Sequence, residues 1–367
     1  MKRPNYLWVD ALRGLAVLLV FMHHIIVIAG RGHIPSQGAW KIFDLGWIGV
    51  DLFFIISGFV VPLSIFRSMD ICGKRHFVCD YARKRLSRIV PLYALTSLIF
   101  VVFVDHHFWL ESSEWRAANV LTHAFFIHNI FPLYAGAING SAWSLGVEMQ
   151  FYLLIAVLLF FWPRRHALLL IPAGIGIAIV WRLVCFSLLG GDAEKVPQLM
   201  FSASQIFGTL DAFFMGAAIA LIVASREHFL HSRLLPSVRH AAFYGLTGLA
   251  LGALTWNIFW QNVTYWDSMP MVVGWRTLLA LSFMFFLLMS MTMPVCKPLE
   301  HLMQPLLYTG KISYGIYLWH IPVIVSFMKT GLGHGRMLFW IVVATFTLSA
   351  FTWHFFEKPI MERYRNV

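Results

Sequence analysis

The sequence predicts an all-α integral membrane protein, a polytopic bundle of about ten transmembrane helices with both termini in the cytoplasm. Of its 367 residues, 59% are hydrophobic and 12% are charged, and that charged share is about half of what a soluble domain carries. Apolar windows of the length that crosses a hydrocarbon core recur along the whole chain. The basic residues between these windows are unevenly distributed. Together these observations predict one domain over residues 1–367, without a fused soluble domain.

The apolar windows set the expected order of the membrane spans. They lie at 7–29, 43–66, 89–104, 143–162, 167–189, 204–224, 240–260, 272–293, 306–328 and 336–356. The first window follows Lys2 and Arg3, but it is too long for a signal peptide and reads as a retained span. Residues 117–134 are also apolar, and we expect them to form a re-entrant or interfacial helix.

The positions of Lys and Arg give the topology. One set of alternate connections holds 18 of these residues and the other set holds 6, so the first set and both termini are expected in the cytoplasm. The net charge of +11 therefore follows from membrane insertion, and no nucleic-acid partner is expected. A basic cytoplasmic loop also contacts anionic lipid of the bilayer. The four cysteines have no metal-type spacing, so neither a metal site nor a disulfide framework is expected.

The first window carries ionisable residues that are costly to place in lipid and are seldom found there without a function. Arg13 and His24 are eleven residues apart, which returns to nearly the same helix face about 16 Å further along the axis. One stripe thus carries a permanent cation near the inner surface and an imidazole near the outer one. An imidazole that titrates near neutral pH is suited to general base catalysis.

Other polar residues fall at the same expected depth as His24. The window that starts near residue 143 enters from outside and carries Trp143, Ser144, Glu148 and Tyr152, the last three at i, i+4 spacing on one face. His320 also reaches the outer half. We therefore expect His24, Glu148 and His320 to converge there.

The inner side has the character of an anion site. Seven Lys and Arg residues lie between 67 and 88. Arg85 and Arg88 are spaced i, i+3 directly before the window at 89–104, where Pro91 is expected to define a turn. Paired guanidinium groups bind phosphates with fork geometry, and Lys84 can add a third cation.

Several further polar residues have alternative explanations. Asp51 is expected to satisfy a backbone or Arg partner, with direct catalysis as the lesser alternative, and Asp211 either orients a partner, caps a helix or acts directly. Arg182, Arg276 and Lys311 lie near span ends and are expected to extend their charged groups to the interface. The Ser-Gly-Phe stretch at 57–59 is typical of close helix packing. His354 and Glu357 are expected to be structural.

Six segments carry a resemblance to a known family. They are DALRGLAVLLVFMHH (10–24), GWIGVDLFFIISGF (46–59), YARKRLSRIVPLY (81–93), SAWSLGVEMQFYLL (141–154), ISYGIYLWHIPV (312–323) and FFEKP (355–359). In this order they resemble the acyltransferase-3 family of integral membrane O-acyltransferases. The family's arginine-ten-histidine motif falls on Arg13 and His24, its Arg-x-x-Arg pair on Arg85 and Arg88, and its Ser-Leu-x-Val-Glu segment on Ser144 to Glu148.

The resemblance implies a bacterial cytoplasmic-membrane enzyme that moves an acyl group, commonly acetyl, from cytoplasmic acyl-CoA to a carbohydrate hydroxyl at the outer face. The acceptor classes it implies are O-antigen, capsule, exopolysaccharide and similar glycans, and other envelope-biosynthesis proteins are possible partners. In this reading the arginines bind the CoA phosphates, the thiol arm passes Arg13, and His24 is the general base with Glu148 as its partner. Trp143 and His320 are the candidates for stabilising the oxyanion.

Three alternatives stay open on sequence grounds. The acyl group could pass through an acyl-enzyme on His24 or on a serine, rather than move directly. The buried His, Glu and Asp residues would also suit a proton-coupled transporter of sugars or lipid-linked glycans. A scaffold in an envelope assembly is the third, and it predicts that His24→Ala has no effect.

Overall fold

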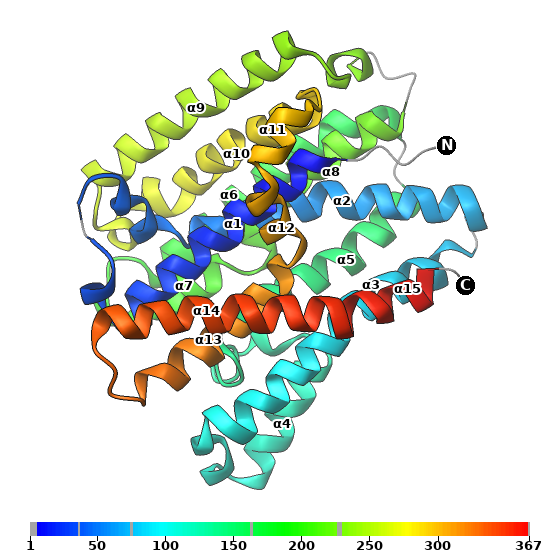
Figure 1. Ribbon diagram of the computed structural model, residues 1–367. Coiled ribbons are helices and arrows are strands. Elements are labelled where there is room, and N and C mark those ends of the chain that lie inside the picture. Colours follow the sequence, from blue (N-terminus) through cyan, green and yellow to red (C-terminus); the bar gives the residue numbers. More distant parts are fainter. Residues whose placement is uncertain (1–5, 36, 74–75, 162–163, 226–229, 366–367) are drawn as a thin grey trace. The chain divides into compact units, whose positions relative to one another are not determined.

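Helices form every regular element of the residues described in the computed structural model, which are 6–35, 37–73, 76–161, 164–225 and 230–365 (Figure 1). The α-helices are α1 Leu7–His24, α2 Ile48–Cys72, α3 Phe77–Ile99, α4 Ser113–Ala124, α5 Trp143–Phe161, α6 Leu170–Leu189, α7 Val196–Ala203, α8 Leu210–Ala224, α9 Val238–Gln261, α10 Arg276–Thr292, α11 Lys297–Leu302, α12 Gln304–Lys311, α13 Ser313–Met328, α14 His334–Thr352 and α15 Lys358–Arg365. Four π-helical turns adjoin them, η1 Ile25–Ala29, η4 Phe100–Val104, η13 Met271–Trp275 and η14 Trp353–Glu357. The remaining elements are 3₁₀ turns, η2 Arg31–His33, η3 Gly38–Leu45, η5 His106–Leu110, η6 His128–Ile130, η7 Gly140–Ala142, η8 Arg164–Leu169, η9 Ala193–Lys195, η10 Ile206–Thr209, η11 His231–Leu234 and η12 Tyr265–Asp267.

The prediction of an all-α polytopic membrane protein is confirmed. Nine helical segments of the described chain are long and apolar enough to cross a membrane. The predicted window at 306–328 differs from these, because Ile312 separates α12 from α13 and leaves an apolar helix of 16 residues. Lys2, Arg3, Lys74, Arg75 and Arg226, which entered the topology argument, lie outside the described residues.

The helix that carries Arg85 and Arg88 is longer than the sequence predicts. α3 starts at Phe77 and continues through Pro91 to Ile99, so the expected turn at Pro91 is wrong and the two arginines lie in mid-helix. A proline inside a transmembrane helix is tolerated because neighbouring groups satisfy the freed backbone carbonyl.

Residues 117–134 do not form a long helix. α4 has 12 residues, or about 18 Å, which is too short to cross a hydrocarbon core of about 30 Å. Ser112 is the N-cap residue of α4, and its hydroxyl accepts a hydrogen bond from the Trp115 N–H at 3.2 Å.

The chain divides into two compact units, and each is described separately. The first comprises residues 1–12, 51–70 and 148–307. Its centre is α8, in which every residue from Leu210 to Ile222 is buried. α8 approaches α2 closely, because a Cβ atom at Gly216 would lie 2.2 Å from the Ile55 carbonyl oxygen. The Phe213 ring stacks on Phe54 and Phe151 at 4.6 and 4.1 Å between centroids.

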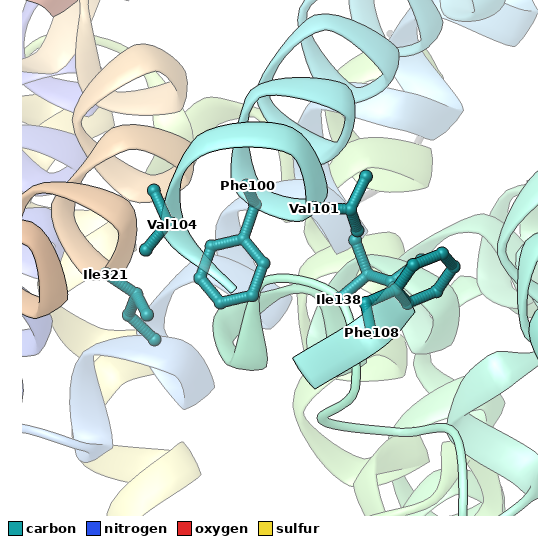
Figure 2. Packing of buried hydrophobic residues seen from close by; sticks show 6 residues of the cluster. All are labelled: Phe100, Val101, Val104, Phe108, Ile138 and Ile321. Carbon is teal, nitrogen blue, oxygen red and sulfur yellow. The ribbon is translucent and has the colours of Figure 1, made fainter. Parts of the chain in front are cut away.

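The second unit comprises residues 13–50, 71–147 and 308–367. α13 is its buried helix and contacts α3, α14, η1, η4 and η7. Figure 2 shows the apolar cluster in which Ile321 of α13 packs with η4 and the following segments, formed by Phe100, Val101, Val104, Phe108, Ile138 and Ile321. α15 packs against α3 at the end of the long rod that α14, η14 and α15 form (Figure 1).

Two glycines bring the start of α2 against α1 within this unit. A Cβ atom would lie 2.1 Å from the Leu19 carbonyl oxygen at Gly46 and 2.4 Å from the Ala16 carbonyl oxygen at Gly49. Any side chain at these positions would push the two backbones apart. The glycines therefore fix the part of α1 that lies between Arg13 and His24.

Candidate active site

His24 is the last residue of α1, and a π-helical turn begins directly after it. Its Nδ1 lies 3.0 Å from the Val20 carbonyl oxygen and 3.2 Å from Nε2 of His320. The expected approach of these two histidines is thus present, although they are 296 residues apart. His24 is half-buried, whereas His320 is fully buried. π-helical turns occur frequently at functional sites, and nothing in the local sequence pattern announced this one.

The two arginines of the predicted anion site, Arg85 and Arg88, belong to the same unit as His24, and so does Arg13. Arg85 is buried in α3 with its guanidinium carbon 5.8 Å from the centre of the Tyr81 ring. Arg88 and Arg13 both act electrostatically on the buried carboxylate of Glu357 in η14. Glu357 therefore lies close to these arginines, and the expectation that it is structural stays a prediction. In the sequence, the FFEKP segment that contains Glu357 was the indication that this residue could be functional.

Lys84 forms an ion pair within α3. It contacts the Asp80 carboxylate one helical turn earlier at 2.5 Å. A phosphate at Lys84 would have to compete with this carboxylate.

The start of α5 is tied to α13 by a chain of buried hydroxyl groups. The hydroxyls of Ser144 and Tyr317 lie 2.5 Å apart, and Tyr317 donates to the Ser141 carbonyl oxygen at 2.8 Å. The Asn139 amide donates to the Leu318 carbonyl oxygen at 2.8 Å. These bonds hold the start of α5 against Tyr317 and Leu318 of α13. Tyr317 precedes His320 by three residues. Tyr317 was not singled out from the sequence, although it lies in the ISYGIYLWH segment.

Glu148 belongs to the first unit, where its Oε1 accepts two hydroxyl groups. Ser57 on α2 donates to it, and Tyr152, one turn later on α5, donates at 2.5 Å. Ser57 therefore makes a specific polar contact in addition to lying beside Gly58, whose Cβ position would be 2.2 Å from the Phe213 carbonyl oxygen. The helix-packing interpretation of this stretch is confirmed at Gly58.

Asp51 and Asp211 each form an ion pair with an arginine inside the first unit. Arg182 binds both carboxylate oxygens of Asp211 at 3.0 and 2.8 Å, and Thr277 donates to the same carboxylate at 2.7 Å. Arg276 binds Oδ1 of Asp51 at 2.7 Å. Arg182 and Arg276 are buried, so the expectation that they reach the membrane surface is wrong. A buried cation in an apolar bundle is retained by pairing with an anion.

A second pair of histidines lies in the segment that carries no family motif. The rings of His123 and His128 stack at 4.0 Å between centroids and 11° between planes. Nδ1 of His123 faces the Asn119 carbonyl oxygen at 2.9 Å, and Nε2 of His128 faces the Ala142 carbonyl oxygen at 3.0 Å. Desolvation, followed by the nearby His128, lowers the pKa of His123 to about 4. Both rings are therefore neutral at physiological pH.

The polar groups of the second unit can carry out acid–base chemistry and bind an anion. Among the described residues no group of three or more His, Cys, Asp or Glu side chains could hold a metal ion. The second unit places His24 beside the buried His320 and holds guanidinium groups on α1 and α3.

Comparison with known proteins agrees with this arrangement. Residues 6–355 match the family model described as "Acyltransferase domain". The chain is 27% identical over 386 residues to "Putative peptidoglycan O-acetyltransferase YrhL" of Bacillus subtilis, covering 96% of this chain and 54% of that protein. It is 24% identical to "O-acetyltransferase OatA" of Staphylococcus aureus, covering 99% of this chain and 58% of that protein.

A third relative matches over more of its own length. "Putative membrane-bound transacylase BcsY" of Komagataeibacter xylinus is 24% identical over 373 residues, which is 98% of this chain and 83% of that protein. No solved structure matches the chain. This chain thus spans little more than half the length of YrhL and OatA. Since the family model covers nearly all of it, the chain belongs to the acyltransferase-3 family.

Proposed function

We propose that this protein is a membrane O-acyltransferase that moves an acyl group, acetyl in the first instance, from acyl-CoA to a hydroxyl group of a cell-envelope carbohydrate. Two of the relatives are named O-acetyltransferases, one of them for peptidoglycan. The observation that carries the proposal is that one compact unit contains both a histidine base at the end of α1 and the arginines of α1 and α3.

The arginines would bind the phosphates of the donor. Guanidinium groups bind phosphate oxygens in bidentate geometry, and Arg85 and Arg88 are one helical turn apart on α3. Arg13 and His24 lie on one continuous helix, about 16 Å apart along the axis. The flexible pantetheine arm of CoA can extend over such a distance, which brings the thioester to His24.

At the thioester the reaction is a direct transfer. His24 takes the proton of the acceptor hydroxyl, and the oxygen attacks the thioester carbonyl carbon. The tetrahedral intermediate collapses with cleavage of the carbon–sulfur bond. The CoA thiolate leaves and takes the proton from His24, so the histidine returns to its neutral form. The role expected for Glu148, stabilising the charged imidazole, stays a prediction.

The test uses the purified full chain in lipid nanodiscs. With acetyl-CoA alone, water takes the place of the carbohydrate hydroxyl, and we expect release of acetate and the CoA thiol that is lost in His24→Ala and kept in His23→Asn. His23 is the matched control, because it is adjacent to His24 and donates to the Phe43 carbonyl oxygen at 3.1 Å.

If the wild-type protein neither binds nor cleaves acetyl-CoA, the enzyme assignment fails and a transporter becomes the better hypothesis. Labelled acyl-protein formed with donor alone would replace direct transfer by an acyl-enzyme relay.

The acceptor is identified separately in cells. We expect mass spectrometry of surface glycans to show O-acetyl groups that disappear in a deletion strain and return with the wild-type gene but not with His24→Ala. The first glycans to analyse are peptidoglycan, which the name of one relative contains, and the exopolysaccharides.

A further inference from the structure

The contact between His24 and His320 determines where the protons of both rings lie. Each ring also faces the carbonyl oxygen four residues earlier in its own helix: Nδ1 of His24 is 3.0 Å from the Val20 oxygen, and Nδ1 of His320 is 3.2 Å from the Ile316 oxygen. A carbonyl oxygen only accepts hydrogen bonds, so both Nδ1 atoms carry a proton. The tautomers follow from this network.

These protons leave one lone pair on each ring. His320 is neutral, because a second proton on its Nε2 would point toward the N–H of His24 at 3.2 Å. Its Nε2 is therefore a hydrogen-bond acceptor for Nδ1–H of His24. That N–H is held between two acceptors, the Val20 carbonyl oxygen and His320, and Nε2 of His24 is left as the basic atom.

We propose that His320 is a positioning residue for the base: its Nε2 lone pair fixes His24 in the Nδ1–H tautomer and directs the free Nε2 of His24 toward the acceptor hydroxyl. This inference rests on the proposed function. When His24 takes the hydroxyl proton on Nε2, its Nδ1–H still donates to His320 and Val20, which stabilises the cation until Nε2–H protonates the departing CoA thiolate.

The surroundings hold the His320 ring in this orientation. The ring contacts Phe21 edge-on at 6.2 Å and Tyr317 at 5.7 Å between centroids. Phe21 lies on α1, three residues before His24. The same helix therefore carries the proposed base and the aromatic ring that packs against His320. All residues of α13 from Gly315 to Ile324 are buried. An uncharged acceptor in this apolar setting avoids the desolvation penalty that a carboxylate in the same place would incur.

The decisive variants are His320→Leu, which removes the acceptor, and His320→Gln, whose amide oxygen can replace it. With acetyl-CoA and the full chain in nanodiscs, we expect kcat to fall about 100-fold or more in His320→Leu, as for loss of a general base, with KM for acetyl-CoA unchanged. We expect His320→Gln to keep at least a tenth of the wild-type kcat. His23→Asn is the control, because His23 lies beside His24 at 5.7 Å between ring centroids but does not contact His320.

The pH profile separates positioning from a purely structural role. Loss of a hydrogen bond to the charged form lowers the pKa of a base, so the acidic limb of kcat/KM moves to lower pH in His320→Leu and stays in place in His320→Gln. Wild-type kcat and an unmoved limb in His320→Leu would overturn the inference. Equal inactivity of both variants with normal donor binding would also overturn it, since the imidazole itself would then be required.

A measurement on the wild-type protein covers the case in which His320→Leu does not fold. ¹⁵N spectra of the histidine-labelled full chain, with His24→Gln to assign the signal by difference, give the tautomer of His24 directly. We expect a protonated Nδ1 and an unprotonated Nε2, and the opposite tautomer would contradict the inference. If wild type shows no acetyl-CoA turnover at all, the proposed function fails instead.

Discussion

In the proposed function, single residues decide how strongly acyl-CoA is bound. Arg85 and Arg88 of α3 carry guanidinium groups, whereas Lys84 carries an ammonium group that is paired with Asp80 at 2.5 Å. A guanidinium group also offers a planar pair of donors that an ammonium group lacks. The three cations of this stretch are therefore not equivalent, although they are nearly adjacent in sequence.

Arg88→Ala is expected to raise KM for acetyl-CoA at least tenfold, because a charge-assisted hydrogen bond contributes about 1.5–3 kcal/mol. The value of kcat at saturating donor should stay near that of the wild type. Steady-state kinetics of CoA thiol release measures both constants. Lys84→Ala is the matched control and should change KM less than threefold. A loss of kcat that saturating donor does not restore would show that Arg88 acts on the reacting atoms.

The stacked pair His123 and His128 makes stability depend on pH. Burial lowers the pKa of His123 from 6.5 to about 4 in the folded protein. The unfolded chain therefore binds more protons between these values, and the free energy of unfolding rises with pH over this range. The stabilisation is complete above pH 6.5 and is lost as the pH falls toward 4.

His123→Gln is accordingly expected to flatten this pH dependence by about 3 kcal/mol between pH 6.5 and 4. Denaturant unfolding of the full chain in detergent micelles, followed by tryptophan fluorescence at several pH values, measures the difference. Carboxylates that titrate near pH 4 contribute equally to both proteins and cancel in the comparison. Parallel curves for variant and wild type would show that His123 is not the titrating group.

At the scale of the helices, close backbone contact decides which small residues matter. On α6, a Cβ atom at Gly174 would lie 2.8 Å from the Leu210 carbonyl oxygen and from Cβ of Phe214 on α8, while one at Gly176 meets no atom within 4 Å. These glycines are two residues apart and face opposite sides of the helix. Interfaces between transmembrane helices commonly use small residues in this way.

Gly174→Ala is therefore expected to destabilise the protein by about 1–3 kcal/mol through overpacking. Gly176→Ala should be neutral or stabilising by up to about 1 kcal/mol, because alanine favours the helix. Unfolding of each variant in mixed micelles with increasing SDS gives both values. Equal behaviour of the two variants would mean that α6 and α8 do not pack closely at Gly174.

At the scale of the whole molecule, two buried ion pairs contribute to stability. Arg182 and Asp211 are each 1% exposed, and Arg276 with Asp51 is buried nearly as deeply. Removing one partner from such a pair leaves an uncompensated charge, which costs about 3–5 kcal/mol. An exposed pair contributes about 0–1 kcal/mol.

Asp211→Ala should thus lower the free energy of unfolding by about 3–5 kcal/mol. Replacing both partners, as in Arg182→Met with Asp211→Leu, should restore most of that loss. Asp192→Ala is the control, since its pair with Lys195 is about half exposed. Normal stability of Asp211→Ala would show that Arg182 is not buried as a cation.

The fold class and the equal expected depth of His24 and His320 could be predicted, because they depend on local patterns, namely apolar length and helical periodicity. Local patterns do not show that the helices of these two histidines are neighbours. The partners of Arg182 and Arg276 could not be predicted, because they depend on which helices become neighbours, and Asp51 is 225 residues from Arg276. The same holds for Glu357 near Arg13 and Arg88. The course of α3 through Pro91 was missed because local rules for proline describe helices in water, where no neighbouring helix compensates the lost hydrogen bond.

The contact of Gly46 and Gly49 with the backbone of α1 has a mechanical consequence. It supports α1 between Arg13 and His24, the two residues that the proposed mechanism uses, so a tilt of α1 would turn about this contact. With the support near the middle of an axial length of about 16 Å, each end lies about 8 Å from it, so a tilt of about 7° moves one end by about 1 Å. A misplacement of that size can cost about 100-fold in rate. A methyl group added at Gly49, far from both the phosphates and the reacting carbonyl, would therefore impair catalysis by spoiling alignment while leaving every reactive group intact.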